Sequence, residues 1–263
     1  MARGQVVRRA VALGGALAAT AGVSARRRPL AAASVAAVGG LAGLAAFHRN
    51  APLFGPLLRH GPRTRARAAL TFDDGPGPST PRVLEALAAA EVRATFFVLG
   101  RQVERHPALV RRIAAEGHQL GSHGYDHGIL VFRGHRHVVE QLARTEVAVA
   151  EALGAPALSP LFRAPHGFRG PTTWAAARSR GYRMVGWTRG VFDSAEPGLE
   201  VIADRAARAL APGAILLLHD ADGWRPEATR EQTAAALPKI CRSAERSGLT
   251  LVTLDALVEG GAS

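Results

Sequence analysis

Two carboxylates stand side by side in the segment TFDDGP, where Asp73 and Asp74 follow the apolar residue Phe72. None of the 72 residues before them is acidic. Adjacent carboxylates repel each other unless a cation is close. One of them can bind a divalent metal while its neighbour acts as general base on a water molecule. An Asx turn or helix cap is the simpler alternative, but the apolar run before the pair favours the end of a strand.

Two histidines, His123 and His127, lie four residues apart in the segment SHGYDH. On a helical turn this spacing places both imidazoles on one face, where they can bind a single divalent metal ion. With Asp74 as third ligand, the set suits zinc, or alternatively cobalt, nickel or manganese. The His-x-x-x-His pattern alone is weak, because surface histidines also occur at this spacing.

Short apolar segments alternate with helical patterns from residue 66 onward. The segments predicted as strands buried on both faces are 66–72, 93–99, 118–123, 161–165, 182–187, 214–219 and 249–254. The helices predicted between them are 79–91, 107–116, 136–153, 172–180, 199–210 and 228–246. We expect Ser79 or Thr80 to cap the first helix. Strand followed by helix, repeated about seven times, indicates parallel strands with right-handed crossovers.

Polar residues of chemical interest lie at or near the carboxyl ends of several predicted strands. They are Asp73, Asp74, His123, Arg163 and His219. A parallel barrel brings the carboxyl ends of its strands together around one site, whereas an open sheet spreads them along a crevice. The sequence therefore predicts an α/β fold, a distorted (β/α)7 barrel preceded by one or more apolar helical segments.

The first 48 residues are predicted to be a membrane anchor or signal region. Two uncharged apolar stretches, 10–25 and 30–47, flank the segment RRRP. The second is long enough to cross a bilayer, and the arginines before it favour a single span with the catalytic domain outside the cytoplasm. The alternatives are secretion after signal cleavage, a hairpin of two spans, and two soluble alanine-rich helices. Residues 49–65 are predicted to be a linker and residues 66–263 the catalytic domain.

The net charge of +12 is concentrated before Asp73. Eleven of the 33 basic residues precede it, so that 22 basic residues remain against 21 acidic ones. A basic surface is typical of nucleic-acid binding, and the nearly neutral body of the chain argues against such a partner. The single cysteine, Cys241, excludes an intrachain disulfide and a cysteine-based zinc site.

Five motifs, TFDDGP, HGYDH, FRAPHG, WTRGVFD and LLLHD, resemble in order and rough spacing those of the polysaccharide deacetylases. This is the NodB-homology group, carbohydrate esterase family 4, and the resemblance covers about residues 66–258. It implies a metal-dependent hydrolase that removes N-acetyl groups from peptidoglycan or chitin-like oligosaccharides and releases acetate. The alternatives are a deacylase of another N-acyl or O-acetyl substrate, a non-catalytic glycan-binding relic and a membrane-tethered nucleic-acid binder.

The resemblance implies roles for individual residues. The catalytic residues are the base Asp73, the arginine that holds it, Arg163, the general acid His219, and the carboxylate that orients the acid, Asp193. The implied metal ligands are Asp74, His123 and His127.

The substrate-binding residues are expected in three segments. His166 stands where the family commonly has Tyr, and its backbone N–H is expected to face the developing oxyanion, with Pro165 shaping the turn. Leu217 is expected to pack against the acetyl methyl group. Trp224, in the loop HDADGWRP, is the aromatic residue that we expect to stack on a sugar ring.

Overall fold

The computed structural model describes residues 54–259. The apolar stretches 10–25 and 30–47 lie outside the described residues. Within residues 54–259, no helix combines the length and the apolar character that crossing a membrane requires.

Eight strands lie in the described part of the chain, and all of their pairings are parallel. They are β1 (Arg67–Asp73), β2 (Thr95–Val98), β3 (Gln119–Ser122), β4 (Leu161–Phe162), β5 (Arg183–Met184), β6 (Arg189–Gly190), β7 (Ile215–His219) and β8 (Thr250–Leu251). Seven follow the order β5-β4-β3-β2-β1-β7-β6, and β8 pairs with the start of β1. Between residues 54 and 259 no pairing joins β5 to β6, so the barrel is not closed. The predicted α/β fold with a distorted barrel is confirmed.

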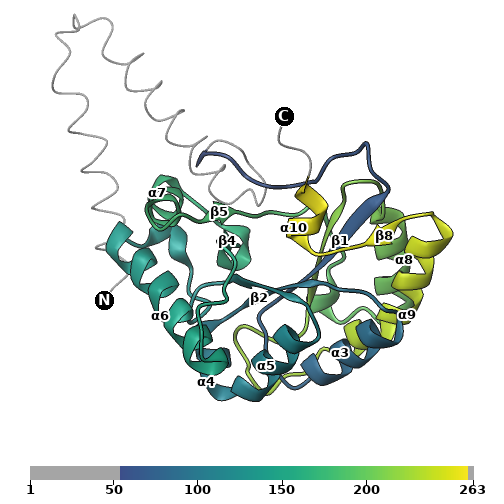
Figure 1. Ribbon diagram of the computed structural model, residues 1–263, viewed down its shortest axis with the longest axis horizontal. Coiled ribbons are helices and arrows are strands. Elements are labelled where there is room, and N and C mark those ends of the chain that lie inside the picture. Colours follow the sequence, from purple (N-terminus) through teal and green to yellow (C-terminus); the bar gives the residue numbers. More distant parts are fainter. Residues whose placement is uncertain (1–53, 260–263) are drawn as a thin grey trace, which may run out of the picture. The chain divides into compact units, whose positions relative to one another are not determined.

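Helices lie around these strands in an arc that runs through α7, α6, α4, α5, α3, α9 and α8 (Figure 1). Their bounds are α3 (Thr80–Ala89), α4 (Gly100–Arg105), α5 (Pro107–Ala115), α6 (His135–Leu153), α7 (Pro171–Ser179), α8 (Leu199–Ala209), α9 (Glu231–Arg246) and α10 (Leu254–Val258). Each predicted helix has its counterpart. Helices α4 and α10 have none among the predictions, because segments of six and five residues are too short to show an apolar period.

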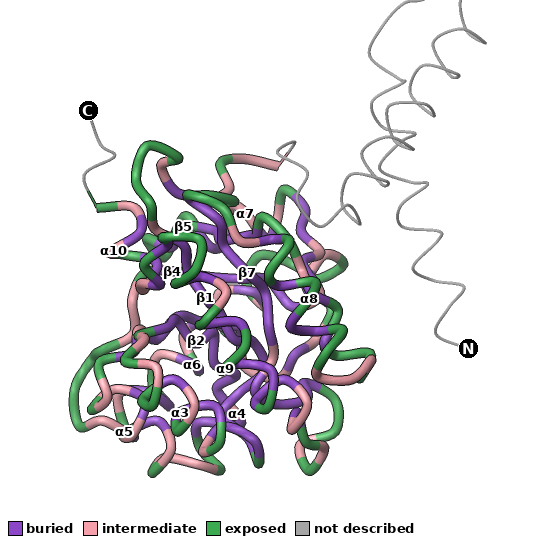
Figure 2. The backbone as a smooth tube through the Cα atoms, turned by 90° about the vertical axis from the view of Figure 1, so that its right-hand side faces the viewer, coloured by how far each residue is buried: buried purple, intermediate pink, exposed green. Residues whose placement is uncertain are grey.

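The central strand β1 pairs with β2, β7 and β8, and it is buried after its first residue (Figure 2). Ala68, Leu70 and Phe72 face the helices in the main hydrophobic cluster. The residues between them point to the other face, because side chains alternate along a strand. Thr71 and Asp73 are therefore held inside the barrel, where both are buried.

Part of the predicted linker packs against the barrel. Leu58 is buried and lies beside β5: its N–H donates to the Met184 carbonyl at 3.0 Å, and its carbonyl accepts from Gly186 N at 2.8 Å. The Gly61 N–H donates to the Gly213 carbonyl, just before β7, at 2.8 Å. These contacts place Leu58 and Gly61 with the barrel rather than in a free linker.

The first helix begins differently from the prediction. Ser79 occupies the N-cap position of α3 without capping it; its hydroxyl donates to Glu231 Oε1 at 2.9 Å and accepts from Arg230 N at 2.7 Å. The Thr80 hydroxyl donates to Asp220 Oδ2 at 2.6 Å. The predicted cap is therefore wrong, because both hydroxyls bind the segments that follow β7.

Candidate active site

The adjacent carboxylates turn toward one point at the carboxyl end of β1. Asp73 is the last residue of the strand, and Asp74 follows it with a left-handed φ of 76°. Neighbours on a regular strand would point to opposite faces. Here both reach the same imidazole, since His123 Nε2 lies 3.9 Å from Asp73 Oδ2 and 3.4 Å from Asp74 Oδ1. The change of backbone conformation at Asp74 therefore allows the pair to act together.

The two histidines of SHGYDH meet Asp74 from the loop after β3. His127 Nε2 lies 3.1 Å from Asp74 Oδ1, and the His123 and His127 rings are 5.4 Å apart. The loop bends through left-handed residues at Gly124, with a φ of 81°, and at His127, with a φ of 62°. The expectation of a helical turn is therefore wrong, although the loop brings the same three side chains together.

The three side chains fit a divalent metal. One ligand atom from each of Asp74, His123 and His127 lies within 4.8 Å of the other two, and all three residues are buried. His123 Nδ1 is 2.8 Å from the Arg163 carbonyl, so Nδ1 carries the donated proton and Nε2 presents its lone pair. Asp74 Oδ1 is buried and accepts no hydrogen bond within residues 54–259. Lone pairs that face one another in a buried site need a cation between them.

The second oxygen of Asp74 is held by the backbone. Gly223 N donates to Asp74 Oδ2 at 3.0 Å. Burial raises the pKa of Asp74, but its contacts with His123 and His127 hold the pKa well below its usual range. A Cβ on Gly223 would lie 2.2 Å from His127 Nδ1, so only glycine fits at this position. Gly223 therefore belongs to the candidate metal site, a role that the sequence did not reveal.

Arg163 fixes Asp73 from inside the barrel. Its guanidinium is fully buried, donates from Nη1 to Asp73 Oδ1 at 2.7 Å and to Thr71 Oγ1 at 2.8 Å, and donates from Nη2 to the Gly186 carbonyl at 2.9 Å. Burial lowers the pKa of Arg163, and the charge of Asp73 opposes that effect. The arginine therefore places a positive charge beside one Asp73 oxygen and holds that oxygen in position.

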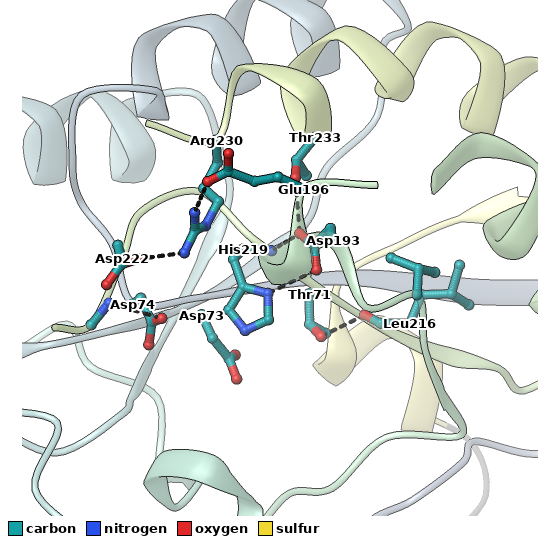
Figure 3. Close-up of polar contacts among 12 residues, drawn as sticks. Thr71, Asp73, Asp74, Asp193, Glu196, Leu216, His219, Asp222, Arg230 and Thr233 are labelled. Carbon is teal, nitrogen blue, oxygen red and sulfur yellow. Dashed lines mark hydrogen bonds and ion pairs between the residues drawn. The ribbon is translucent and has the colours of Figure 1, made fainter. Parts of the chain in front are cut away.

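A second carboxylate orients His219. His219 ends β7 in register with Asp73 of β1. Its Nδ1 lies 2.8 Å from Asp193 Oδ1, and its backbone N–H donates to Asp193 Oδ2 at 2.7 Å. Thr233 Oγ1 donates to the same Oδ2 at 2.9 Å (Figure 3). Burial lowers the pKa of His219, but the charge and the hydrogen bond of Asp193 outweigh burial and raise it to about 9. His219 is therefore charged at neutral pH and can donate a proton.

A pocket of about 330 Å³ opens over these residues. His166, Leu217 and Trp224, three of the residues predicted to bind substrate, line it. Pro165 does not line the pocket; it is buried in the turn Pro165–Gly167. The Trp224 ring, 60% exposed, stacks on the His166 ring at 5.4 Å and 19°. The pocket therefore has an aromatic wall beside the candidate metal ligands.

His166 itself stays uncharged. Burial, with the nearby His127 and His123, lowers its pKa to about 4. Its backbone is left-handed, with a φ of 60°, and its ring lies 4.3 Å from that of His127. An uncharged ring does not repel a cation bound beside it.

Five residues that contact the predicted site residues or line the pocket were not predicted from the sequence. They are Thr71, Gly223 and Thr233, which bind predicted site residues, and Asp222 and Arg230, which line the pocket. Thr71 had a usable signal, because it lies two residues before Asp73 on the same face of a strand. The others lie on later segments without any recognisable pattern.

Comparison with known proteins agrees with this geometry. The family described as Polysaccharide deacetylase matches residues 60–185, a range that includes the Asp73, Asp74, His123, His127 and Arg163 positions but ends before Asp193 and His219. A chitooligosaccharide deacetylase of Sinorhizobium fredii is 34% identical over 208 residues, which cover 75% of this chain and 95% of that protein.

Two further proteins extend the likeness. A peptidoglycan-N-acetylglucosamine deacetylase of Bacillus cereus is 32% identical, over 75% of this chain and 90% of that protein. The structure of a family 4 carbohydrate esterase from Streptomyces lividans, in complex with acetate, has a TM-score of 0.63 and 30% identity and covers 70% of this chain and 91% of that one. Relatives of this identity and coverage show that the chain belongs to the polysaccharide deacetylase family.

Proposed function

We propose that this protein is a metal-dependent N-deacetylase that removes acetyl groups from the amino sugars of peptidoglycan or a chitin-like oligosaccharide. The observation that carries the proposal is the meeting of three metal-ligating side chains with Asp73 and the charged His219 in one pocket. Hydrolysis of an amide requires a base for the attacking water and an acid for the leaving nitrogen. Asp73 and His219, at paired positions of the neighbouring strands β1 and β7, offer both in one pocket.

The protein's own side chains account for the proton transfers. Asp73, with one oxygen held by Arg163, accepts a proton from the water that attacks the acetyl carbon. His219 donates its proton to the sugar nitrogen as the C–N bond breaks, because an unprotonated amide nitrogen is a very poor leaving group. Acetate keeps the oxygen of the water, and the sugar leaves as a free amine.

A cation at Asp74, His123 and His127 would polarise the acetyl carbonyl and stabilise the charge that develops on its oxygen. We propose zinc as the resident ion, with cobalt, nickel or manganese as alternatives, because two imidazoles and one carboxylate suit these first-row metals.

The lining of the pocket supports an acetylated sugar as substrate. Leu217 offers an apolar surface for the acetyl methyl group, and the exposed face of Trp224 offers a plane for a sugar ring. The two relatives described above are named for chitooligosaccharide and for peptidoglycan N-acetylglucosamine. Both substrates carry the N-acetyl group that the pocket would hold.

Hydrolysis of the alternative substrate, an O-acetyl ester, depends less on a general acid in the site. An alkoxide leaves with less help from an acid than an amine does, so a histidine that Asp193 holds as a proton donor is of more use in amide hydrolysis.

We propose further that residues 1–48 anchor the catalytic domain outside the cytoplasm, or direct its secretion after signal cleavage. The two apolar stretches and the arginines that precede the second support this location. Fractionation of cells that express the full chain tests it, and recovery in the cytosolic fraction alone would contradict both versions.

Release of acetate from N-acetylated chitooligosaccharides, peptidoglycan and acetylxylan tests the function. We expect acetate from an N-acetylated glycan, loss of that activity with a chelator, and recovery when zinc is added. Acetate from acetylxylan alone would indicate an esterase instead. Asp73→Asn should still bind metal but lose about 10²-fold to 10⁴-fold in turnover, the usual contribution of a general base. An Asp73→Asn enzyme with normal turnover would refute the assignment of the base.

A further inference from the structure

The segment 220–225 after β7, which we call the β7 loop, forms one wall of the metal site. Gly223 donates its N–H to Asp74 Oδ2 at 3.0 Å, and Trp224 stacks on His166. The Gly223 carbonyl accepts a hydrogen bond from Arg101 of α4. The loop therefore positions both a hydrogen bond to a metal ligand and the aromatic wall of the pocket.

The shape of the β7 loop depends on Asp222. One of its oxygens, Oδ1, accepts from the backbone N–H groups of Trp224 and Arg225, each at 2.8 Å. These bonds close a tight turn around Gly223. Burial raises the pKa of Asp222, but the two backbone bonds and the charge of Arg230 lower it below its ordinary value.

The other oxygen of Asp222 binds a buried arginine. Arg230 is 4% exposed and donates from Nη2 to Asp222 Oδ2 at 2.7 Å (Figure 3). Its Nη1 donates to Glu196 Oε1 at 3.0 Å. Glu196 ends the short turn that starts at Asp193, and its N–H donates to the Asp193 carbonyl at 2.9 Å. The planar guanidinium thus joins the β7 loop, through Asp222, to the turn that starts at Asp193, through Glu196.

The backbone of Arg230 is also held in place. Arg230 precedes α9, and its N–H donates to Ser79 Oγ at 2.7 Å. Thr233, in the first turn of the same helix, donates to Asp193 Oδ2. The residues at the start of α9 therefore contact both sides of the site, Arg230 through Asp222 and Thr233 through Asp193. A buried ion pair adds little net stability compared with well-packed apolar side chains, so stability alone gives little reason for an arginine here.

We propose that Arg230 is a positioning residue that ties the metal side of the site to the acid side. Through Asp222 it holds the β7 loop so that Gly223 reaches Asp74, and through Glu196 it holds the turn of Asp193. A lysine could not replace it fully, because an ammonium group lacks the planar fork that spans two carboxylates. The inference rests on the proposed function of the same site.

Arg230→Met removes the fork and keeps much of the side-chain volume. In the metal-free protein we expect the Gly223 amide to exchange its hydrogen at least about tenfold faster than in the wild type, while the amides of β7 keep their protection. We expect the dissociation constant for zinc, measured by competition with a chromogenic chelator, to rise by about 10-fold to 100-fold, as is usual when a group that orients a metal ligand is lost. Neither measurement uses a substrate, so each is independent of whether the proposed deacetylation is correct.

Arg225→Ala is the matched control. Arg225 also approaches Asp222 Oδ2, at 3.3 Å, but its side chain is 70% exposed. Its removal should leave both the exchange of Gly223 and the zinc affinity unchanged. If Arg230→Met fails to fold, Asp222→Asn makes the same test, because the Asn carbonyl can accept from the Trp224 and Arg225 amides while its NH₂ group cannot accept from Arg230. Wild-type exchange at Gly223 together with wild-type zinc affinity, in whichever of these variants folds, would overturn the proposal.

Discussion

Removing the negative charge of Asp193 should lower the pH at which His219, the proposed general acid, loses its proton. Burial lowers the pKa of His219, but the charge and hydrogen bond of Asp193, with smaller effects of Asp74 and Asp73, raise it from 6.5 to about 9. This difference corresponds to about 3 kcal/mol in favour of the charged imidazole. In Asp193→Asn the burial remains and only the smaller effects of Asp74 and Asp73 still raise the pKa, so we expect the pKa of His219 to fall to about 6.5.

The sign of the effect follows from the role of the acid. In the proposed mechanism His219 acts in its protonated form, which is present below its pKa and lost above it. At pH 8 the protonated fraction should fall from about 90% to about 3%, which reduces the rate about 30-fold, whereas at pH 6 about three quarters stays protonated. The loss of activity should therefore be large on the alkaline side and small on the acidic side.

Two measurements check this prediction. Titration of the His219 ring by NMR in the metal-free protein reports its pKa directly, and initial rates between pH 6 and pH 9 report its use. Thr233→Val is the control, because it removes one hydrogen bond to Asp193 Oδ2 and leaves the charge. A His219 that still titrates near pH 9 in Asp193→Asn, or an equal loss of rate at pH 6 and pH 8, would refute the reasoning.

Two other substitutions test the metal site and the buried ion pair. Gly223→Ala places a methyl group where a Cβ would lie 2.2 Å from His127 Nδ1, so zinc affinity should fall about 10-fold to 100-fold while added zinc restores activity; unchanged affinity would contradict the close fit. Arg163→Met leaves Asp73 buried without its partner, so the free energy of unfolding in urea should drop by about 3–5 kcal/mol with loss of turnover. A drop in the free energy of unfolding below about 1 kcal/mol would show that the buried ion pair between Arg163 and Asp73 contributes no more than an exposed one.

Long, buried elements were predictable because their apolar patterns are local. β1 and β7 are mostly apolar segments, and α6 and α9 are long enough to show a clear period. β6 was not predicted, since its two residues in WTRGVFD include a glycine and form no apolar run. Its place in the sheet comes from pairing with β7, which only the folded chain reveals.

The candidate site divides in the same way. Asp73, Asp74, His123 and His127 stand in compact motifs whose residue types already indicate a metal and a base. Gly223 and Arg230 act across the fold, on partners 149 residues and 151 residues away in Asp74 and Ser79. A glycine that is needed for a close approach, or an arginine that is needed for its fork, has no signature in the residues next to it.

The register of two neighbouring strands has a consequence for how this enzyme can change. Asp73 and His219 occupy paired positions in β1 and β7, so the separation of their backbones is that of adjacent strands in any sheet, about 4.8 Å. Trp224 and His166, by contrast, lie outside the strands on connecting segments. Changing the side chains at Trp224 and His166, with Asp222 and Gly223 kept, should select a new glycan while the spacing of the proposed proton donor and acceptor is inherited unaltered.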